Sequence, residues 1–161
     1  MPTLRQVARL GMAAIALLGG ALLLSPASVR GQATRTLELL PGEYLWLPEL
    51  SPRGPVLVLV SLPEQRAYVY RNGVRIGVST ISSGRPGFET PSGVYTILQK
   101  HREHYSNLYD NAPMPFMQRL TWGGVALHAG ALPGYPASHG CVRLPRAFAE
   151  KLFDVTSAGT V

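Results

Sequence analysis

The only cysteine in this 161-residue chain, Cys141, lies in the segment Ser138-His139-Gly140-Cys141-Val142-Arg143. The thiolate is the nucleophilic form of cysteine, and a nearby imidazolium or guanidinium group lowers the pKa of a thiol from about 8.5. Gly140 has no side chain to obstruct an incoming carbonyl group, and it lets the backbone turn its N–H groups toward a developing oxyanion. The segment therefore predicts a nucleophilic Cys141 with a lowered thiol pKa. A lone cysteine is more often a small buried apolar residue, so other features must support this prediction.

His128, upstream of this segment, could supply the general base that such a nucleophile needs. It ends the apolar segment 122–128, which has the composition of a short strand, and a loop leads from it to Cys141. A nucleophile, a base and oxyanion donors are the components of acyl transfer through a thioester. We expect His128 to act first as base and then as acid. The backbone N–H of Cys141, with that of Gly140 or His139, is expected to bind the oxyanion.

Together these residues resemble the L,D-transpeptidase catalytic domain, a cysteine-dependent family that cross-links peptidoglycan. The family pattern is a histidine at the end of a strand, a loop, and then Ser/Thr-His-Gly-Cys-x-Arg. The resemblance runs from about Pro55 to the C-terminus and includes Gln65, the Asn72-Gly73 turn and Thr90-Pro91-Ser92-Gly93. It implies a mainly β, β-rich α+β fold: a β-sandwich with a flap loop and one short C-terminal helix.

The resemblance also implies roles for neighbouring residues. His139 would shape the pocket or hydrogen-bond the substrate, and Ala129 could orient His128 only through its backbone carbonyl. Arg143 would either hold a substrate carboxylate in a bidentate contact or brace the loop around the cysteine. The other candidates for substrate binding are Ser138, Tyr105 and Thr90, although Thr90 has a structural alternative in a turn.

The implied substrate is a peptidoglycan stem peptide. The enzyme would attack the bond between the third residue, meso-diaminopimelate or a similar residue, and the terminal D-alanine of a tetrapeptide. The acyl group would pass to an amine of a second stem, giving a 3→3 cross-link, or to a lysine of an anchored lipoprotein. With water as acceptor the enzyme would be an L,D-carboxypeptidase, and the sequence leaves this choice open. No cofactor is implied.

Two other classes of function are alternatives. A zinc site could be built from His101, His104, His128, His139 and Cys141, because zinc accepts imidazole and thiolate ligands. The pair His101 and His104 lies in an irregular segment that would not pre-order ligands, so we expect no metal. A non-catalytic cell-wall-binding module is the second alternative, and the presence of both Cys141 and His128 argues against it.

The N-terminus has the layout of a secretory signal peptide. Arg5 and Arg9 precede an uncharged apolar run at 10–24, and small residues follow up to Ala33. As a helix this run would extend about 22 Å, short of the roughly 30 Å hydrocarbon core of a membrane. We expect residues 1–33 to be cleaved and the protein to be exported to the periplasm or cell envelope. An uncleaved anchor is the alternative, and this segment would then be the protein's only contact with a membrane.

The formal net charge of +6 includes Arg5, Arg9 and Arg30. Without them the chain has twelve basic and nine acidic residues, a charge of +3, which is too low and too dispersed for a nucleic-acid-binding surface. A mildly cationic exported protein suits an anionic polymer such as a cell wall. In an oxidising compartment an unpaired cysteine is a liability unless the protein uses it.

The rest of the chain predicts the scaffold. Residues 34–54 are expected to form an extended arm whose apolar side chains lie on the single catalytic domain, residues 55–161. Strands are expected at 56–61, buried on both faces, and at 65–71 and 74–83, joined by a hairpin turn at Asn72-Gly73. Further strands are expected at 93–98 and 122–128.

Residues 100–121 show neither helical nor strand periodicity. A loop of about twenty residues in a compact domain is uncommon and is often a lid, so we expect a flap over the substrate cleft. A surface loop pinned by its aromatic residues is the alternative. Pro145 is expected to open a helix whose buried face carries Leu144, Phe148, Leu152 and Val155. The resembled family usually continues through a closing strand, so either this domain ends early or residues are missing after Val161.

Overall fold

The computed structural model of the protein describes residues 38–161. The predicted signal peptide, residues 1–33, lies outside the described residues. Among the described residues, no helix is both long and apolar enough to span a bilayer.

The first sheet has four antiparallel strands in the order β1-β4-β3-β2. Their bounds are β1 Tyr44–Trp46, β2 Val56–Ser61, β3 Arg66–Arg71 and β4 Val74–Thr80, and a 3-10 helix, Pro48–Leu50, follows β1. The predicted hairpin between β3 and β4 is confirmed. Asn72 and Gly73 have φ values of +50° and +77°, as a two-residue turn between twisted strands requires.

Strand β2 lies at the edge of this sheet, and the prediction that both of its faces are buried is wrong. Leu57 and Leu59 are 45% and 48% exposed, while Val58 and Val60 pack against the core. The sequence shows a continuous apolar run, but burial alternates with a period of two because only one face of the strand meets the core. Val58 N–H donates to the carbonyl of Val161 at 2.9 Å, on the side away from β3.

Part of the predicted arm is a strand of the sheet. Trp46 in β1 lies opposite Gly77 in β4, and its indole occupies the space where a Cβ at that position would stand, at 2.7 Å. Tyr44 and Trp46 then cover the ring of Phe148, with ring centroids 5.6 and 5.5 Å apart. The apolar side chains on the other face of the arm, such as Leu45, are exposed.

The second sheet has the order β5-β6-β7-β8 and is antiparallel except for the parallel pair β7·β8. Its strands are β5 Gln99–His101, β6 Met117–Arg119, β7 Ala126–Ala129 and β8 Val142–Leu144. The strand predicted at 93–98 is not formed, and pairing begins only at Gln99. The strand predicted at 122–128 starts later, because residues 122–124 form a turn.

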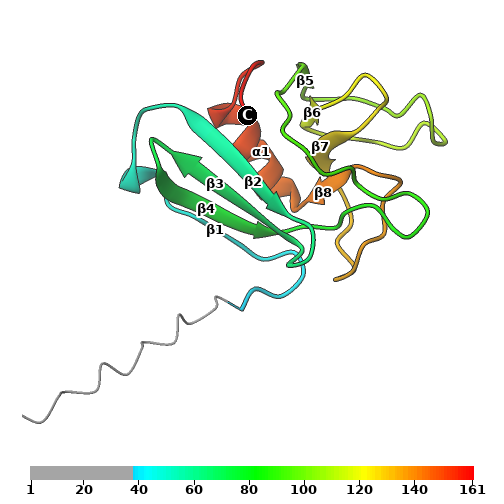
Figure 1. Ribbon diagram of the computed structural model, residues 1–161, viewed down its shortest axis with the longest axis horizontal. Coiled ribbons are helices and arrows are strands. Elements are labelled where there is room, and N and C mark those ends of the chain that lie inside the picture. Colours follow the sequence, from blue (N-terminus) through cyan, green and yellow to red (C-terminus); the bar gives the residue numbers. More distant parts are fainter. Residues whose placement is uncertain (1–37) are drawn as a thin grey trace, which may run out of the picture. The chain divides into compact units, whose positions relative to one another are not determined.

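The predicted flap is more regular than its sequence suggests. Strands β5 and β6 pair as an antiparallel hairpin, and an isolated bridge joins Tyr105 to Pro113 further along it. Figure 1 shows this hairpin and its long connection projecting away from the first sheet. The strands are only three residues long, too short for a pattern of alternation to stand out in the sequence.

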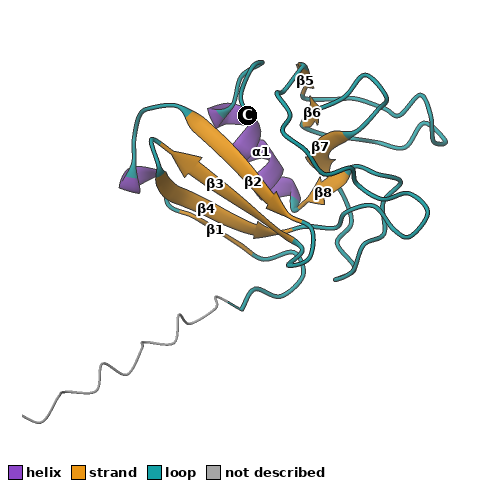
Figure 2. Ribbon diagram, in the orientation of Figure 1, coloured by secondary structure: helices purple, strands orange, loops and turns teal. Residues whose placement is uncertain are grey.

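Helix α1, Arg146–Val155, contributes to the core shared by both sheets. Phe148 and Leu152 are fully buried, and Val155 is partly buried, as the sequence predicts. Pro145 precedes the helix as its N-cap residue, and Leu144 belongs to β8 instead of the helix. Figure 2 shows the result: a mainly β fold with one longer helix near the C-terminus, as the sequence predicts.

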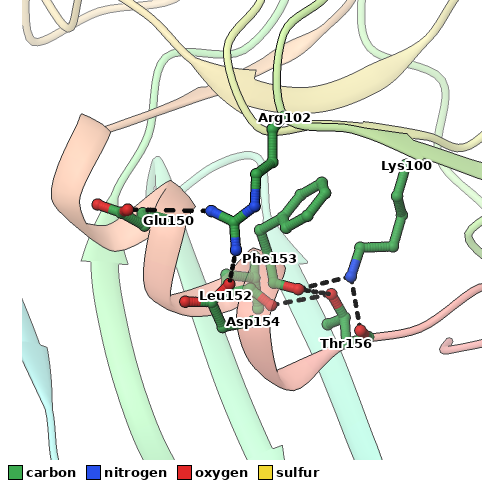
Figure 3. A network of polar contacts seen from close by, with 7 residues as sticks. All are labelled: Lys100, Arg102, Glu150, Leu152, Phe153, Asp154 and Thr156. Carbon is green, nitrogen blue, oxygen red and sulfur yellow. Dashed lines mark hydrogen bonds and ion pairs between the residues drawn. The ribbon is translucent and has the colours of Figure 1, made fainter.

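Side chains of β5 and of the residue that follows it hold the C-terminal end of α1 (Figure 3). Lys100 Nζ donates to the carbonyls of Phe153 and Thr156 at 2.5 and 2.6 Å, and Arg102 Nη2 lies 2.7 Å from Asp154 Oδ1. The last carbonyls of a helix have no partner within the helix, so a cation placed there satisfies them. These contacts attach the second sheet to the helix at the end far from Pro145.

Replacement of Phe148 by alanine should lower the free energy of unfolding by about 3 to 5 kcal/mol. The substitution removes a buried aromatic ring and leaves a cavity in the core. Chemical denaturation would measure this change. Leu59→Ala, at an exposed position of β2, is the matched control and should have a much smaller effect. Equal effects of the two substitutions would contradict the position of the core.

Candidate active site

The loop that carries the cysteine is attached to the end of the first sheet by backbone hydrogen bonds. Ser82 and Arg143 form an antiparallel bridge in which each N–H donates to the other's carbonyl at 3.0 Å. Ser83 O accepts the N–H of Ser138 at 3.0 Å. Gln65 fixes Ser83 in turn, because its Nε2 donates to Ser83 Oγ at 2.8 Å and its Oε1 accepts the Ser83 N–H at 3.0 Å. Gln65 therefore supports the cysteine loop indirectly.

Within the loop, Ser138 closes a tight turn. Its buried Oγ donates to Cys141 O at 2.5 Å and accepts the N–H of Gly140 at 3.1 Å. Gly140 has φ +111°, a conformation that only glycine adopts without strain. Thr90 Oγ1 donates to Gly140 O at 2.9 Å and accepts the N–H of Gly84 at 2.9 Å. The hydroxyl groups of Ser138 and Thr90 thus shape the loop.

His128 lies in β7 and is buried, with its ring at the cavity beside the cysteine loop. Its Nδ1 is 2.8 Å from Ala129 O. A carbonyl oxygen can only accept, so Nδ1 carries the hydrogen and Nε2 is left with a free lone pair. The contact with the carbonyl of Ala129 is the one that the sequence predicts.

Cys141 is half-buried and lines the same cavity as His128, which has a volume of about 490 Å³. Its Sγ donates to Gly124 O at 3.4 Å. Within residues 38–161, no hydrogen bond joins Sγ to the imidazole. In this structure the thiol hydrogen is therefore directed to the Gly124 carbonyl.

Burial determines the charge of both groups. Desolvation lowers the pKa of His128 to about 4, against a smaller opposite effect of the Ala129 carbonyl. Desolvation also raises the pKa of the Cys141 thiol, and this outweighs the lowering by the Ala126 backbone, Arg143 and Arg119. The prediction of a lowered thiol pKa is therefore wrong for this state of the protein. The sequence shows the nearby cations but not the loss of water.

Within the segment 138–141, two backbone N–H groups have no acceptor among the described residues: those of His139 and Cys141. The N–H of Gly140, which the sequence makes a candidate oxyanion donor, is already bonded to Ser138 Oγ. His139 and Cys141 therefore offer the available pair of donors beside the thiol.

The side chain of His139 connects the cysteine loop to the flap. Its ring stacks on Tyr109 with centroids 4.4 Å apart and an interplanar angle of 28°, and it meets Phe88 edge-on at 4.8 Å. Desolvation, with Arg85 and then Arg143, lowers the pKa of His139. The ring thus helps to form the wall of the cavity that the flap covers.

Of the residues predicted to bind substrate, Arg143 lines the cavity and Tyr105 does not. Arg143 lines the cavity, and its methylene groups pack against Gly130, where a Cβ would lie 3.0 Å from them. Tyr105 is 57% exposed and does not line the cavity, whereas His104 and Ser106 do. Side chains of an extended segment alternate in direction, so the two neighbours of Tyr105 face the side opposite to it.

The sequence left several cavity residues without a role. Leu108 and Tyr109 of the flap, together with Arg119 and Arg146, line the cavity that contains Cys141. The sequence shows the types of these residues, but their common position depends on the register of the flap hairpin and, for Arg146, on the placement of α1. Over residues 38–161, no three His, Cys, Asp or Glu side chains are grouped around a possible metal position.

We expect iodoacetamide to alkylate Cys141 more slowly than N-acetylcysteine near neutral pH, because burial keeps the thiol protonated. The midpoint of the rate profile should lie above the pKa of the free thiol. The His128 ring should stay neutral until the pH falls to about 4, which NMR of its ring protons would measure. A thiol midpoint below that of N-acetylcysteine would mean that the nearby arginines outweigh burial.

Known proteins resemble this chain in sequence and in fold. The family model of the L,D-transpeptidase catalytic domain matches residues 55–161. The probable L,D-transpeptidase 3 of Mycobacterium tuberculosis is 31% identical over 102 residues, 52% of this chain and 36% of that protein.

Two solved structures are similar as well. An L,D-transpeptidase from Stackebrandtia nassauensis has a TM-score of 0.61 and 28% identity, covering 66% of this chain and 53% of that one. L,D-transpeptidase 3 from Mycobacterium tuberculosis, in complex with a faropenem-derived adduct, has a TM-score of 0.59 and 28% identity, covering 65% and 57%. This chain thus spans between about a third and just over half of these relatives. The match over residues 55–161, with the fold and the cysteine site that accompany it, shows that the chain belongs to the L,D-transpeptidase catalytic domain family.

Proposed function

We propose that the protein is a peptidoglycan L,D-transpeptidase that works through a Cys141 thioester. One observation carries this proposal. His128 donates from Nδ1 to Ala129 O, which leaves Nε2 as a proton acceptor in the cavity that holds the Cys141 thiol. The N–H groups of His139 and Cys141 supply the oxyanion donors, each worth about 10² to 10³ in rate.

The first half-reaction starts from a neutral thiol and a neutral imidazole. The Sγ proton passes to His128 Nε2 as sulfur bonds to the carbonyl carbon of the third residue, and the carbonyl oxygen becomes an oxyanion. The C–N bond then breaks, and the proton on Nε2 passes to the nitrogen of the leaving D-alanine. The low pKa of His128 makes its imidazolium form a strong acid, which favours this second transfer.

The second half-reaction consumes the thioester. An acceptor amine loses a proton to His128 Nε2 and attacks the thioester carbonyl, the C–S bond breaks, and the proton returns to Sγ. An amine from another stem gives a 3→3 cross-link, and a lysine of a lipoprotein gives an anchored protein. Water would give the L,D-carboxypeptidase reaction. These substrates lie in the cell envelope, which is consistent with residues 1–33 acting as an export signal.

Mass spectrometry of the products tests the proposal. Purified disaccharide-tetrapeptide incubated with the protein should lose D-alanine and form dimers. Loss of D-alanine without dimers would show that water is the acceptor. An unchanged tetrapeptide, with Cys141 confirmed as a reduced thiol, would refute the proposed reaction and leave a wall-binding function.

The two histidines should differ in their effect on turnover. His128→Ala removes the group that carries the proton, so we expect a loss of roughly 10² to 10⁴ in the rate of D-alanine release. His139→Ala should cost less, because it removes a stacked ring but leaves the backbone N–H groups in place. Matched thermal melts would separate these effects from loss of stability. An inactive His139→Ala beside a largely active His128→Ala, both folded, would move the base into the cysteine loop.

A further inference from the structure

A second cavity, the β2 groove, lies on the other face of the β7·β8 pair. It has a volume of about 460 Å³ and is lined by β2, by the segment 90–97 and by the last two residues of the chain. Leu127 and Val142, which are partners in the register of β7 and β8, also line it. The next pair in this register, His128 and Arg143, lines the active-site cavity instead. Because side chains alternate between the two faces of a sheet, β7 and β8 separate the groove from the active site.

The walls of the β2 groove are uncharged. Within the described residues 38–161, no aspartate, glutamate, lysine, arginine or histidine lines it. Three of its apolar residues are exposed: Val94 by 88%, Leu59 by 48% and Leu57 by 45%. Exposed apolar surface around an apolar cavity is typical of a binding site. The groove therefore suits a neutral, apolar occupant.

The edge of β2 adds backbone donors and acceptors to these walls. Pro55 O accepts an N–H from the β3–β4 turn at 2.9 Å, so every second residue from Pro55 directs its backbone groups to β3. Val58 and Val60 direct theirs away from β3, into the edge that lines the groove. The N–H of Val60 and the carbonyls of Val58 and Val60 have no partner in the part of the chain that the structure describes. Open groups of this kind are satisfied by another strand.

The end of the chain shows that extended backbone fits beside β2. Val161 O accepts the N–H of Val58 at 2.9 Å. On the other side, Ile97 N–H donates to Thr160 O and Gly159 N–H donates to Ile97 O, both at 2.8 Å. The last three residues thus hydrogen-bond to β2 and to Ile97, but none of these bonds reaches Val60.

Strand β2 has none of the features that protect a strand edge from pairing. Val56–Ser61 contains no charge and no proline, and its pairing with β3 shows no register shift. Among the described residues, no other edge strand could fill the groove of a second copy, because β1, β5 and β8 have three residues each. Strand β2 itself has its Val58 N–H already bonded. A different polypeptide therefore fits this edge better than a second copy.

We propose that the β2 groove binds an extended, uncharged segment of a partner protein, which adds to β2 as a strand. Its main chain pairs with the open groups of Val58 and Val60, and its alternate apolar side chains enter the groove. The site lies outside the active-site cavity, so this inference does not rest on the proposed function.

A peptide of alternating valine and threonine with blocked ends is the probe, because one of its faces is apolar and it carries no charge. Fluorescence polarisation of the labelled peptide should show saturable binding. A matching peptide with two adjacent prolines at its centre lacks main-chain donors there and should bind at least about tenfold more weakly. Absence of saturable binding, or equal binding of the two peptides, would overturn the inference.

Hydrogen exchange measured by NMR tests whether the peptide adds as a strand. The N–H of Val60 should exchange at least about tenfold more slowly when the peptide is bound, because it gains an acceptor. The N–H of Leu59 faces β3 and should be unchanged. Binding without slower exchange at Val60 would mean that the groove recognises side chains alone, and strand addition would be wrong.

Two exposed valines give a matched pair of variants. Val94→Asp places a charge at the groove and should weaken peptide binding at least about tenfold, because the charge loses water when the peptide covers it. Val74→Asp is the control, since Val74 is 41% exposed in β4 and does not line the groove. Equal affinities of the two folded variants would overturn the position of the site.

Two further measurements exclude other occupants and other sites. Complete alkylation of Cys141 by iodoacetamide should leave peptide affinity unchanged, whereas loss of binding would place the peptide in the active-site cavity and overturn the inference. Light scattering should find a monomer in the absence of peptide. A dimer in which Val60 N–H is already protected would identify a second copy as the occupant and would overturn the proposed partner.

Discussion

The geometry of the site depends on the bridge between the end of the first sheet and the cysteine loop. Ser82 and Arg143 exchange two backbone hydrogen bonds, and Ser83 accepts a third from Ser138. Since Arg143 belongs to β8 and β8 pairs with β7, the same contacts fix the loop relative to His128. Cys141 immediately precedes β8 and His128 lies in β7, so this bridge joins both residues to the other sheet.

The electrostatics of the cavity combine opposite tendencies. Burial favours the neutral forms of Cys141 and His128, while the arginines around them favour a thiolate. Burial has the larger effect, so the thiol form of Cys141 is favoured. The proposed function accordingly starts from a neutral thiol and a neutral imidazole.

The sequence predicts which residues meet at the cavity better than it predicts what surrounds them. Residue types and spacing predict that Cys141 and His128 belong to one site, and the family resemblance implies the carbonyl of Ala129 as the partner of His128. The structure places all three at one cavity. The prediction that Tyr105 lies at the substrate site is not met, because the side to which its side chain points depends on the register of the flap hairpin. The predicted direction of the thiol pKa is wrong because the residues that exclude water from Cys141 are far apart in the sequence. The predicted burial of both faces of β2 is wrong because an apolar run does not reveal that the strand lies at a sheet edge.

The stacking of His139 on Tyr109 links the flap to the chemistry of the loop. The imidazole of His139 belongs to the same residue as one of the two unbonded N–H groups beside the thiol. Leu108 packs against Gly124, where a Cβ would lie 2.8 Å from it, and the carbonyl of Gly124 accepts the thiol. The flap thus contacts both His139, whose N–H is a proposed oxyanion donor, and Gly124, whose carbonyl accepts the hydrogen bond from Cys141 Sγ. A change in the flap position would therefore act on His139 and on the carbonyl bonded to Cys141 together.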